Sequence, residues 1–206
     1  LADFEESSGQ LNLWAPTQAP FFVRKEVAHV LDLSLEVVQV RSVVIGGGFG
    51  GKSQSPEPIA IAAMLSMKTG KPVKILLNRQ EEFFSGKSDH AKKMRIKSAV
   101  AADGTILGRY TDFWVDNGAY THMGPAYISA VRQRNCNLYR VGAAGFDGKL
   151  VHTNKVSGGS YRGMGSPQII WAIETQIDEI AEKLGKDKLE YRIEIANRPG
   201  DRTPMG

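Results

Sequence analysis

One run of glycines limits the fold of this chain more than any other stretch. Residues 46–53 read GGGFGGKS and lie between a β-branched segment that ends at Ile45 and a segment that contains Pro56 and Pro58. Adjacent glycines let a backbone adopt left-handed conformations and approach other groups closely, so we expect a loop here. The run fits two motifs at once, the phosphate-binding G-x-x-x-x-G-K-S/T loop and the dinucleotide G-x-G-x-x-G fingerprint.

The phosphate-loop interpretation requires a helix that begins at Lys52–Ser53, because the first N–H groups of that helix must face the phosphates. Pro56 and Pro58 would fall inside its first two turns, at about 3 kcal/mol each in a helix interior. We therefore expect the helix to start near one of these prolines. The next apolar segment ends in Asn78, which leaves both motifs without their acidic residue. A nucleotide-binding module that uses Gly46–Ser53 is kept as the alternative hypothesis.

A second glycine-rich segment, SGGSYRGMGSPQ, occupies Ser157–Gln168 and leads into a helix. We expect that helix over Pro167–Leu184, with Ser166 as its N-cap and Gly185 as its stop. Two loops rich in backbone N–H donors, one of which contains Arg162, suit a large, planar, anionic ligand. Either loop alone would be interpreted as a tight connection, but the pair favours a ligand site.

Hydrophobic periodicity predicts the other elements of the fold. Strands are expected at residues 9–15, 36–45, 72–77, 92–102, 106–115 and 145–154, and helices at 20–33, 58–69 and 189–196. Asp103-Gly104 predicts a hairpin turn, whereas the stretch Gly118–Tyr139 indicates neither a helix nor a strand. The helix at 58–69 is apolar nearly all round, which is typical of a helix buried on most sides. The irregular order of these elements predicts an α+β fold with mixed β-sheets and packed helices.

The composition argues against several classes of partner. The net charge is only +4, and the densest basic run, Lys87–Lys97, alternates like a strand with one solvated face, so we expect no nucleic-acid site. Cys136 is the one cysteine, which excludes an internal disulfide and a cysteine-based metal cluster; we expect a buried thiol. No apolar stretch is long enough to span a bilayer, so we expect no membrane partner and a cytoplasmic location.

Four segments in order, TQAP, GGGFGGK, VHTNKVSGGSYRGMGSPQ and AIETQIDEIAEKLG, resemble the molybdenum hydroxylases, the family of xanthine dehydrogenase and aldehyde oxidase. The resemblance covers nearly all 206 residues, which would form the first part of a molybdopterin-binding region. In that family the dithiolene sulfurs of a pyranopterin hold the metal. The resemblance therefore implies a molybdenum–molybdopterin cofactor and no direct metal ligand from this chain.

The resemblance also implies which residues contact the cofactor. They lie in the TQ segment and the two glycine-rich loops: Gln18, Gly48, Phe49, Gly50, Arg162 and Gly163. In the family the TQ glutamine hydrogen-bonds a terminal ligand of the metal, and the first glycine loop lines the metal site. The arginine of the second loop lies beside the cofactor.

Three positions depart from the patterns of particular family members. Ser53 directly follows GGK, where purine-oxidising members carry a glutamate, and Ala130 takes the place of their substrate-binding arginine, with Arg132 and Arg134 close by. Gly163 stands where carbon monoxide dehydrogenases have a cysteine. These departures disfavour a purine or carbon monoxide. The substrate classes that the resemblance leaves are aldehydes, N-heteroaromatics and aromatic acyl-CoA thioesters.

The family's catalytic base is a glutamate far downstream that this sequence does not contain, so we expect no catalytic residue here. We expect a fragment or split subunit of a larger molybdenum hydroxylase that is inactive and cofactor-free by itself. The implied partners are the rest of the molybdopterin subunit, an iron–sulfur subunit with 2Fe-2S centres and, in some members, a flavin subunit with FAD. The complete oligomer would hydroxylate a small-molecule substrate with water as the oxygen source. A partial enzyme should also expose apolar surface and self-associate.

Overall fold

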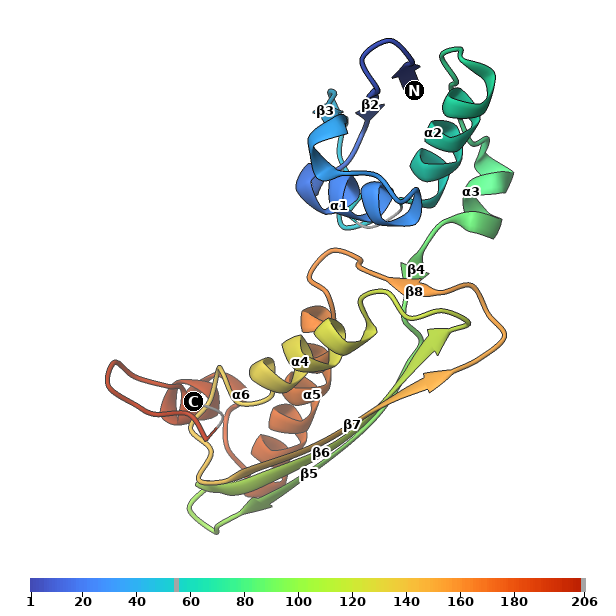
Figure 1. Ribbon diagram of the computed structural model, residues 1–206. Coiled ribbons are helices and arrows are strands. Elements are labelled where there is room, and N and C mark those ends of the chain that lie inside the picture. Colours follow the sequence, from blue (N-terminus) through green and yellow to red (C-terminus); the bar gives the residue numbers. More distant parts are fainter. Residues whose placement is uncertain (54–55, 205–206) are drawn as a thin grey trace. The chain divides into compact units, whose positions relative to one another are not determined.

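The computed structural model describes residues 1–53 and 56–204, which form two compact units (Figure 1). The N-terminal unit comprises Leu1–Ser88 and Gly159–Arg162, and the C-terminal unit comprises Asp89–Gly158 and the chain from Gly163 onward. Each unit has its own hydrophobic core and its own three-stranded sheet. In each of these sheets the central strand has one antiparallel and one parallel neighbour. This mixed pairing confirms the predicted α+β fold with mixed sheets.

The N-terminal unit contains β1 (Ala2–Glu5), β2 (Gln10–Ala15), α1 (Pro20–Val30), the 3-10 turn η1 (Leu35–Val37), β3 (Val38–Ser42), α2 (Glu57–Thr69) and α3 (Arg79–Ser85). Strand β2 is central, antiparallel to β1 and parallel to β3. Alternation along QLNLWA turns Leu11 and Leu13 into the core, where Val27 of α1 and Ala63 of α2 are also fully buried. The predicted strand at 9–15 is confirmed.

Several predicted bounds in this unit were wrong. Helix α1 ends at Val30 rather than residue 33, because Asp32 takes a left-handed φ of 53° and turns the chain. Strand β3 covers only the middle of the predicted 36–45, since η1 occupies the first residues and Val44 is exposed. The predicted strand at 72–77 contributes a single bridge, between Val73 and Ala2. Its alternate apolar residues pack on the core without a hydrogen-bonded ladder.

Helix α2 is not buried on most sides as predicted. Ala62, Ala63 and Ser66 face the core, whereas Ile61 and Met64, three residues apart, stay exposed. One face of the helix is therefore buried and the other is exposed, although both faces are apolar. A second apolar contact surface is the ordinary reason for such a pattern.

The C-terminal unit is built on β5 (Lys92–Val100), β6 (Ile106–Gly118) and β7 (Ala144–His152), with α4 (Gly124–Arg134), α5 (Ser166–Leu184) and α6 (Lys188–Ile195). Helices α4 and α5 lie together along the same sheet (Figure 1), and they contact β7 and β5 respectively. Two short strands, β4 (Ser88–Asp89) and β8 (Gly158–Gly159), pair with each other. The boundary between the two units falls inside each of these strands.

The apolar stripe predicted on the long helix forms the core of this unit. Ile169, Ile173, Ile177 and Ala181 of α5 are buried, and Gly185 ends the helix in a left-handed conformation as predicted. The predicted N-cap was wrong. Gly165, with a φ of 83°, takes the cap position, and Ser166 is already helical.

The C-terminal strands agree closely with the predicted ranges, and two elements differ. The hairpin between β5 and β6 has a loop that spans residues 101–105, and only Gly104 in it has a positive φ. The stretch left unassigned contains α4, whose Tyr127 and Val131 are fully buried. Cys136 is a buried free thiol, as expected. Along β5 exposed and half-buried residues alternate, which confirms the solvated basic face.

A carboxylate at the end of β6 makes the stability of this unit sensitive to acid. Asp116 Oδ1 accepts hydrogen bonds from the Gly118 N–H and the Thr153 hydroxyl, and Oδ2 accepts from Lys155 Nζ. These contacts, the one with Lys155 foremost, lower the pKa of Asp116 from 3.8 to about 2. Because the folded-state pKa is lowered, the stabilisation exists above about pH 4 and is lost as the pH falls toward about 2.

We expect Asp116→Asn to lower the free energy of unfolding by about 1–2 kcal/mol at neutral pH. The loss arises because the amide cannot replace a carboxylate that accepts three hydrogen bonds. Urea titrations between about pH 2 and pH 6 check this: the difference from wild type should shrink as Asp116 becomes protonated. A difference that stays constant down to the lowest pH would contradict the assignment.

Candidate functional site

The first glycine loop is tied to the TQ segment by hydrogen bonds. The Gln18 N–H donates to the Lys52 carbonyl at 2.9 Å, and the Thr17 hydroxyl donates to the same oxygen at 3.2 Å. The Gly50 N–H donates to Gln18 Oε1 at 3.1 Å. Because an N–H can only donate, the oxygen of the Gln18 amide must face the loop, and its NH₂ group remains available as a donor.

Two glycines of this loop pack closely against other residues, Gly48 against the Gln18 side chain and Gly50 against backbone. A Cβ at Gly48 would lie 2.3 Å from Gln18 Oε1, and a Cβ at Gly50 would lie 2.6 Å from the Ser160 carbonyl oxygen. Gly50 also has a φ of 98°. The first loop, Gln18 and the part of the second glycine-rich segment around Ser160 therefore meet within the N-terminal unit.

Phe49 and Arg162 approach each other at the same place. Phe49 is a non-glycine residue with a φ of 49°, a conformation that costs about 1 kcal/mol or more. Phe49 is 62% exposed, and the Arg162 guanidinium lies 5.9 Å from the centre of its ring. An exposed aromatic ring in a strained conformation, beside an exposed cation, is typical of a ligand site.

Gly163 belongs to the C-terminal unit and follows Arg162 directly. Gly163, Met164 and Gly165 have φ angles of 93°, 43° and 83°, so three consecutive residues are left-handed. The Ser166 hydroxyl and N–H both turn back to the Gly163 carbonyl, which closes the turn before α5. The structure thus brings Gln18, Gly48, Phe49, Gly50 and Arg162 together within one unit, and it places Gly163 at a tight turn of the other.

The nucleotide alternative requires a helix that begins at Lys52, and the structure does not have one. Lys52 and Ser53 lie in a turn, and α2 begins at Glu57 with Pro56 as its cap, as the prolines predicted. Gln54 and Ser55 fall outside the described residues. Lys52 Nζ is occupied at 2.6 Å by the Ile45 carbonyl of its own loop. The arrangement gives the nucleotide interpretation no support.

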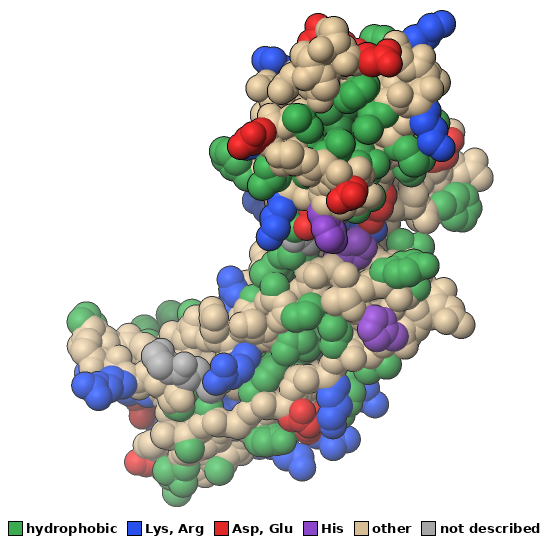
Figure 2. Space-filling view, viewed as in Figure 1, with side chains coloured by type: hydrophobic (Ala, Val, Ile, Leu, Met, Phe, Trp, Pro, Cys, Tyr) green, Lys and Arg blue, Asp and Glu red, His purple; other side chains and the backbone are tan. Residues whose placement is uncertain are grey.

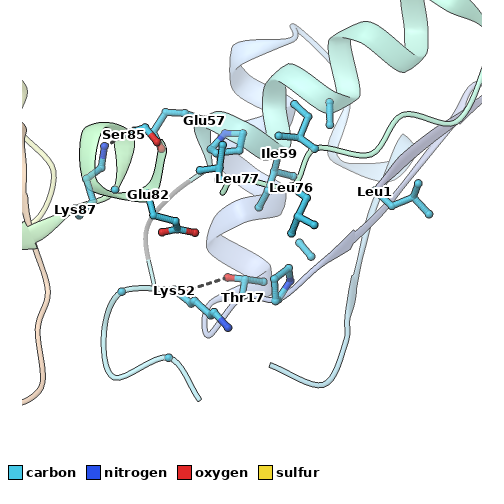
Figure 3. A pocket seen from close by; sticks show the side chains of 18 of the residues that line it. Leu1, Thr17, Lys52, Glu57, Ile59, Leu76, Leu77, Glu82, Ser85 and Lys87 are labelled. Atoms are coloured by element: carbon cyan, nitrogen blue, oxygen red, sulfur yellow. Dashed lines mark hydrogen bonds and ion pairs between the residues drawn. The ribbon is translucent and has the colours of Figure 1, made fainter. Parts of the chain in front are cut away.

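A cavity in the N-terminal unit lies beside the first glycine loop (Figure 3). Its volume is about 400 Å³, and Gly47, Gly48 and Gly51 form one wall. Thr17, Lys52, Glu57, Glu82 and Lys87 lie around it, with Lys87 and Glu57 paired at 2.7 Å. Gln18, Phe49, Gly50 and Arg162 do not line it. We assign the candidate site to that residue cluster and not to the cavity.

The cluster suits an anionic, planar cofactor. Among the contacts of the described residues, the backbone N–H groups of residues 46–49 have no protein acceptor. Glycines with positive φ at Gly46 and Gly47 let such groups converge on an anion. Arg162 adds a positive charge and Gln18 a neutral donor. In the described ranges no group of three or more His, Cys, Asp or Glu side chains could hold a metal ion.

Sequence reasoning missed two contributors to this arrangement. Thr17 links the TQ segment to the loop through the Lys52 carbonyl and caps the turn by accepting from the Ala19 N–H. Ser160 supplies the carbonyl against which Gly50 packs. The threonine of the TQ pair was a readable signal, because threonine hydroxyls commonly bond nearby backbone groups. The Ser160 contact depends on tertiary structure.

An α+β scaffold with two glycine-rich loops, a strained aromatic residue and an arginine is compatible with a cofactor-binding domain. The sequence profile of the molybdopterin cofactor-binding domain matches residues 1–195. The xanthine dehydrogenase molybdenum-binding subunit of Escherichia coli O157:H7 is 34% identical over 97% of this chain and 27% of its own length.

Solved structures agree with this match. Aldehyde oxidoreductase from Desulfovibrio gigas superposes with a TM-score of 0.92 and 31% identity, over 98% of this chain and 22% of that one. Quinoline 2-oxidoreductase from Pseudomonas putida 86 gives a TM-score of 0.88 and 33% identity, over 97% and 26%. The chain belongs to the molybdopterin cofactor-binding domain family. It spans about a quarter of the length of these relatives.

Proposed function

We propose that this chain forms one wall of the cofactor site of a molybdenum hydroxylase. The observation that carries the proposal is the meeting of Gln18, Phe49, Gly50 and Arg162, at the positions that the family resemblance assigns to the cofactor. Loop N–H groups and Arg162 would bind the anionic parts of a molybdopterin, and Gln18 would donate a hydrogen bond from its NH₂ group. The bound cofactor supplies the redox chemistry, and these residues bind and orient it.

The remaining roles belong to the whole enzyme. A catalytic base would come from outside residues 1–206, and electrons would pass to 2Fe-2S centres and, in some arrangements, to FAD on other subunits or domains. A cytoplasmic location is part of the proposal, and it is compatible with a single, free cysteine. Across the described residues, none of the helices is long and apolar enough to cross a bilayer.

The substrate class is proposed from Ser53 and the region around Ala130. The Ser53 hydroxyl donates its hydrogen to the Gly50 carbonyl at 2.5 Å, so it does not donate to a ligand in this arrangement. Ala130 is buried on α4, and Arg134 donates to its carbonyl at 2.8 Å. The identity to the xanthine dehydrogenase subunit does not decide the question, because the quinoline and aldehyde relatives are similarly close. We propose an aldehyde, an N-heteroaromatic or an aromatic acyl-CoA thioester.

The test of the proposal is the cofactor content of the protein expressed from its own gene, with whatever the reading frame encodes on either side. We expect about one molybdenum and one pterin per polypeptide, measured by plasma mass spectrometry and by fluorescence of the oxidised pterin. Residues 1–206 alone should contain neither. A purified full-length protein without molybdenum, or hydroxylation by residues 1–206 with added cofactor, would contradict the proposal.

The N-terminal unit exposes an apolar surface that we propose receives the rest of the molybdenum-binding subunit. No residue of α3 is buried, and Phe83 and Phe84 are 78% and 72% exposed. Ile61, Met64 and Leu65 add an exposed stripe on α2. Figure 2 shows hydrophobic side chains gathered on the visible face of this unit. About three quarters of the length of these relatives lies outside the aligned region. We propose that the corresponding part of this protein covers the exposed surface.

We expect residues 1–206 alone to self-associate through this surface. Phe83→Ser/Phe84→Ser should weaken self-association at least about ten-fold, because covering one such ring contributes roughly 1.5–3 kcal/mol. Sedimentation equilibrium measures the effect. Phe21→Ser is the matched control, since Phe21 is 83% exposed but lies on α1. A monomeric wild-type chain, or equal effects of the two substitutions, would show that the α2–α3 surface does not mediate self-association.

A further inference from the structure

A cluster of polar and aromatic side chains lies in the C-terminal unit, and none of its members is among the residues assigned to the cofactor. It consists of Asp89, His90, Lys92, Tyr127 and Gln168. The Asp89 carboxylate accepts from Lys92 Nζ at 2.5 Å and from Gln168 Nε2 at 2.8 Å. Lys92 Nζ also donates to the Tyr127 hydroxyl at 3.0 Å. These bonds connect β4, β5, α4 and α5.

This network is not explained by stability alone. Tyr127 is fully buried and the Lys92 side chain is only 11% exposed. Burial, and the neighbouring Asp89, raise the pKa of Tyr127, so its hydroxyl stays protonated. Taking a charged pair and a hydroxyl out of water is costly, and apolar side chains of similar volume are often as stable or more so. A network of this kind is better understood as a device that fixes one arrangement of the elements it joins.

What the network fixes is the second glycine-rich segment. A Cβ at Gly158 would lie 2.0 Å from His90 Nδ1, and a Cβ at Gly165 would lie 3.0 Å from the Tyr127 ring. The His90 and Tyr127 rings contact each other edge to face, with centroids 4.7 Å apart. Two touching rings therefore support the entry and the exit of the segment. Gln168 ties the first turn of α5 to the same cluster.

The turn that these residues support requires such support. Gly163, Met164 and Gly165 are all left-handed, and Met164 has a side chain that penalises this conformation by about 1–2 kcal/mol. Strained backbone persists only where surrounding structure determines it. Ser166 closes the turn on the Gly163 carbonyl, and Val131, the Tyr127 ring and the Asp89–Gln168 bond support it from outside.

We propose that Asp89, Lys92, Tyr127 and Gln168, with His90, form a positioning network that holds the Gly163–Gly165 turn in one backbone conformation. The network touches the turn and not the cofactor. The idea that the network thereby presents Gly163 to a cofactor rests on the proposed function. The effect of the network on the turn is independent of that function, and it can be measured in the protein without cofactor.

Two amides report on the turn, because the Ser166 N–H donates to Gly163 O and the Ile169 N–H donates to Gly165 O. In Lys92→Met, NMR-detected hydrogen exchange at both amides should be about ten- to a hundred-fold faster, whereas amides in the centre of β6 should keep their wild-type rates. Lys93→Met is the matched control. Lys93 lies next along β5 on its exposed face, and its substitution should change neither group of amides.

Two milder variants keep the proposal falsifiable if Lys92→Met does not fold. Tyr127→Phe keeps the ring that packs on Gly165 but removes the hydroxyl, and Gln168→Met removes only the bond to Asp89. Each should accelerate exchange at Ser166 and Ile169 selectively. Unchanged rates at these amides, or equal acceleration throughout β6, would overturn the network. A wild-type protein that never carries molybdenum would instead overturn the proposed function and leave the network intact.

Discussion

Replacement of Gly50 by alanine should cost about 3 kcal/mol of the free energy of unfolding and abolish cofactor retention. The left-handed φ of 98° penalises any side chain by roughly 1–2 kcal/mol. The new Cβ would also lie 2.6 Å from the Ser160 carbonyl oxygen, a backbone atom that cannot rotate away. Forced movement in a close-packed region costs typically about 1–3 kcal/mol. The first and second glycine-rich segments should separate at this contact.

Gly51→Ala is the matched control for this experiment. Gly51 is the next residue of the same loop, its φ is not positive, and a Cβ there would lie 3.4 Å from the nearest oxygen, that of Gly48. We expect a loss below about 1 kcal/mol and normal molybdenum content. Urea unfolding of residues 1–206 and molybdenum analysis of the full-length protein measure the two effects. Equal behaviour of the two variants would show that contact with Ser160 is not what the loop requires.

The sequence was most informative where one local rule was sufficient. Pro56 and Pro58 limited where α2 could begin, and the helix begins between them. The stripe on α5 followed from its 3.6-residue period, and those side chains form the core. The candidate site depended on spacing and resemblance rather than on local rules. Gln18, Gly48, Phe49, Gly50 and Arg162 lie in one unit and Gly163 in the other, and the roles of all six toward the cofactor stay predictions.

The failures have physical causes that differ from element to element. Helix α3 carried a readable signal, since Asn78 and Glu81 form a capping box, but Asn78 was interpreted as the end of a strand. The apolar residues of 72–77 alternate as a strand does, yet only Val73 finds a bridge partner. Ser166 is a good capping residue by composition. The left-handed Gly165 takes that place and packs closely on Val131 and Tyr127, a tertiary contact that no local rule reveals.

The prediction of a single region for residues 1–206 also depends on information outside the local sequence. The family profile runs through both units, to residue 195, and each unit has an independent core. Gln18 and Arg162 belong to the N-terminal unit, whereas Gly163 belongs to the other. Whether both units contribute to one cofactor region stays a prediction. The network around Tyr127 and the contact at Gly50 allow each unit to be tested separately.

The amide of Gln18 allows cofactor binding to be separated from folding. Gln18→Glu is nearly isosteric, and a carboxylate oxygen can still accept from the Gly50 N–H, as Gln18 Oε1 does at 3.1 Å. The side chain is exposed, so the free energy of unfolding should change by less than about 0.5 kcal/mol. The NH₂ donor, however, becomes a second acceptor with negative charge. An anionic cofactor should therefore bind about ten- to a hundred-fold more weakly.

Gln18→Leu completes this test, because it removes both the acceptor for Gly50 and the donor for the cofactor. We expect it to lower molybdenum content as Gln18→Glu does and, in addition, to loosen the loop, since the Gly50 N–H loses its partner at a cost of about 1 kcal/mol. Molybdenum content after gel filtration and urea unfolding distinguish the two variants. If Gln18→Glu retained the cofactor at the wild-type level, the amide would not face it, and the orientation inferred from the Gly50 hydrogen bond would have no role in binding.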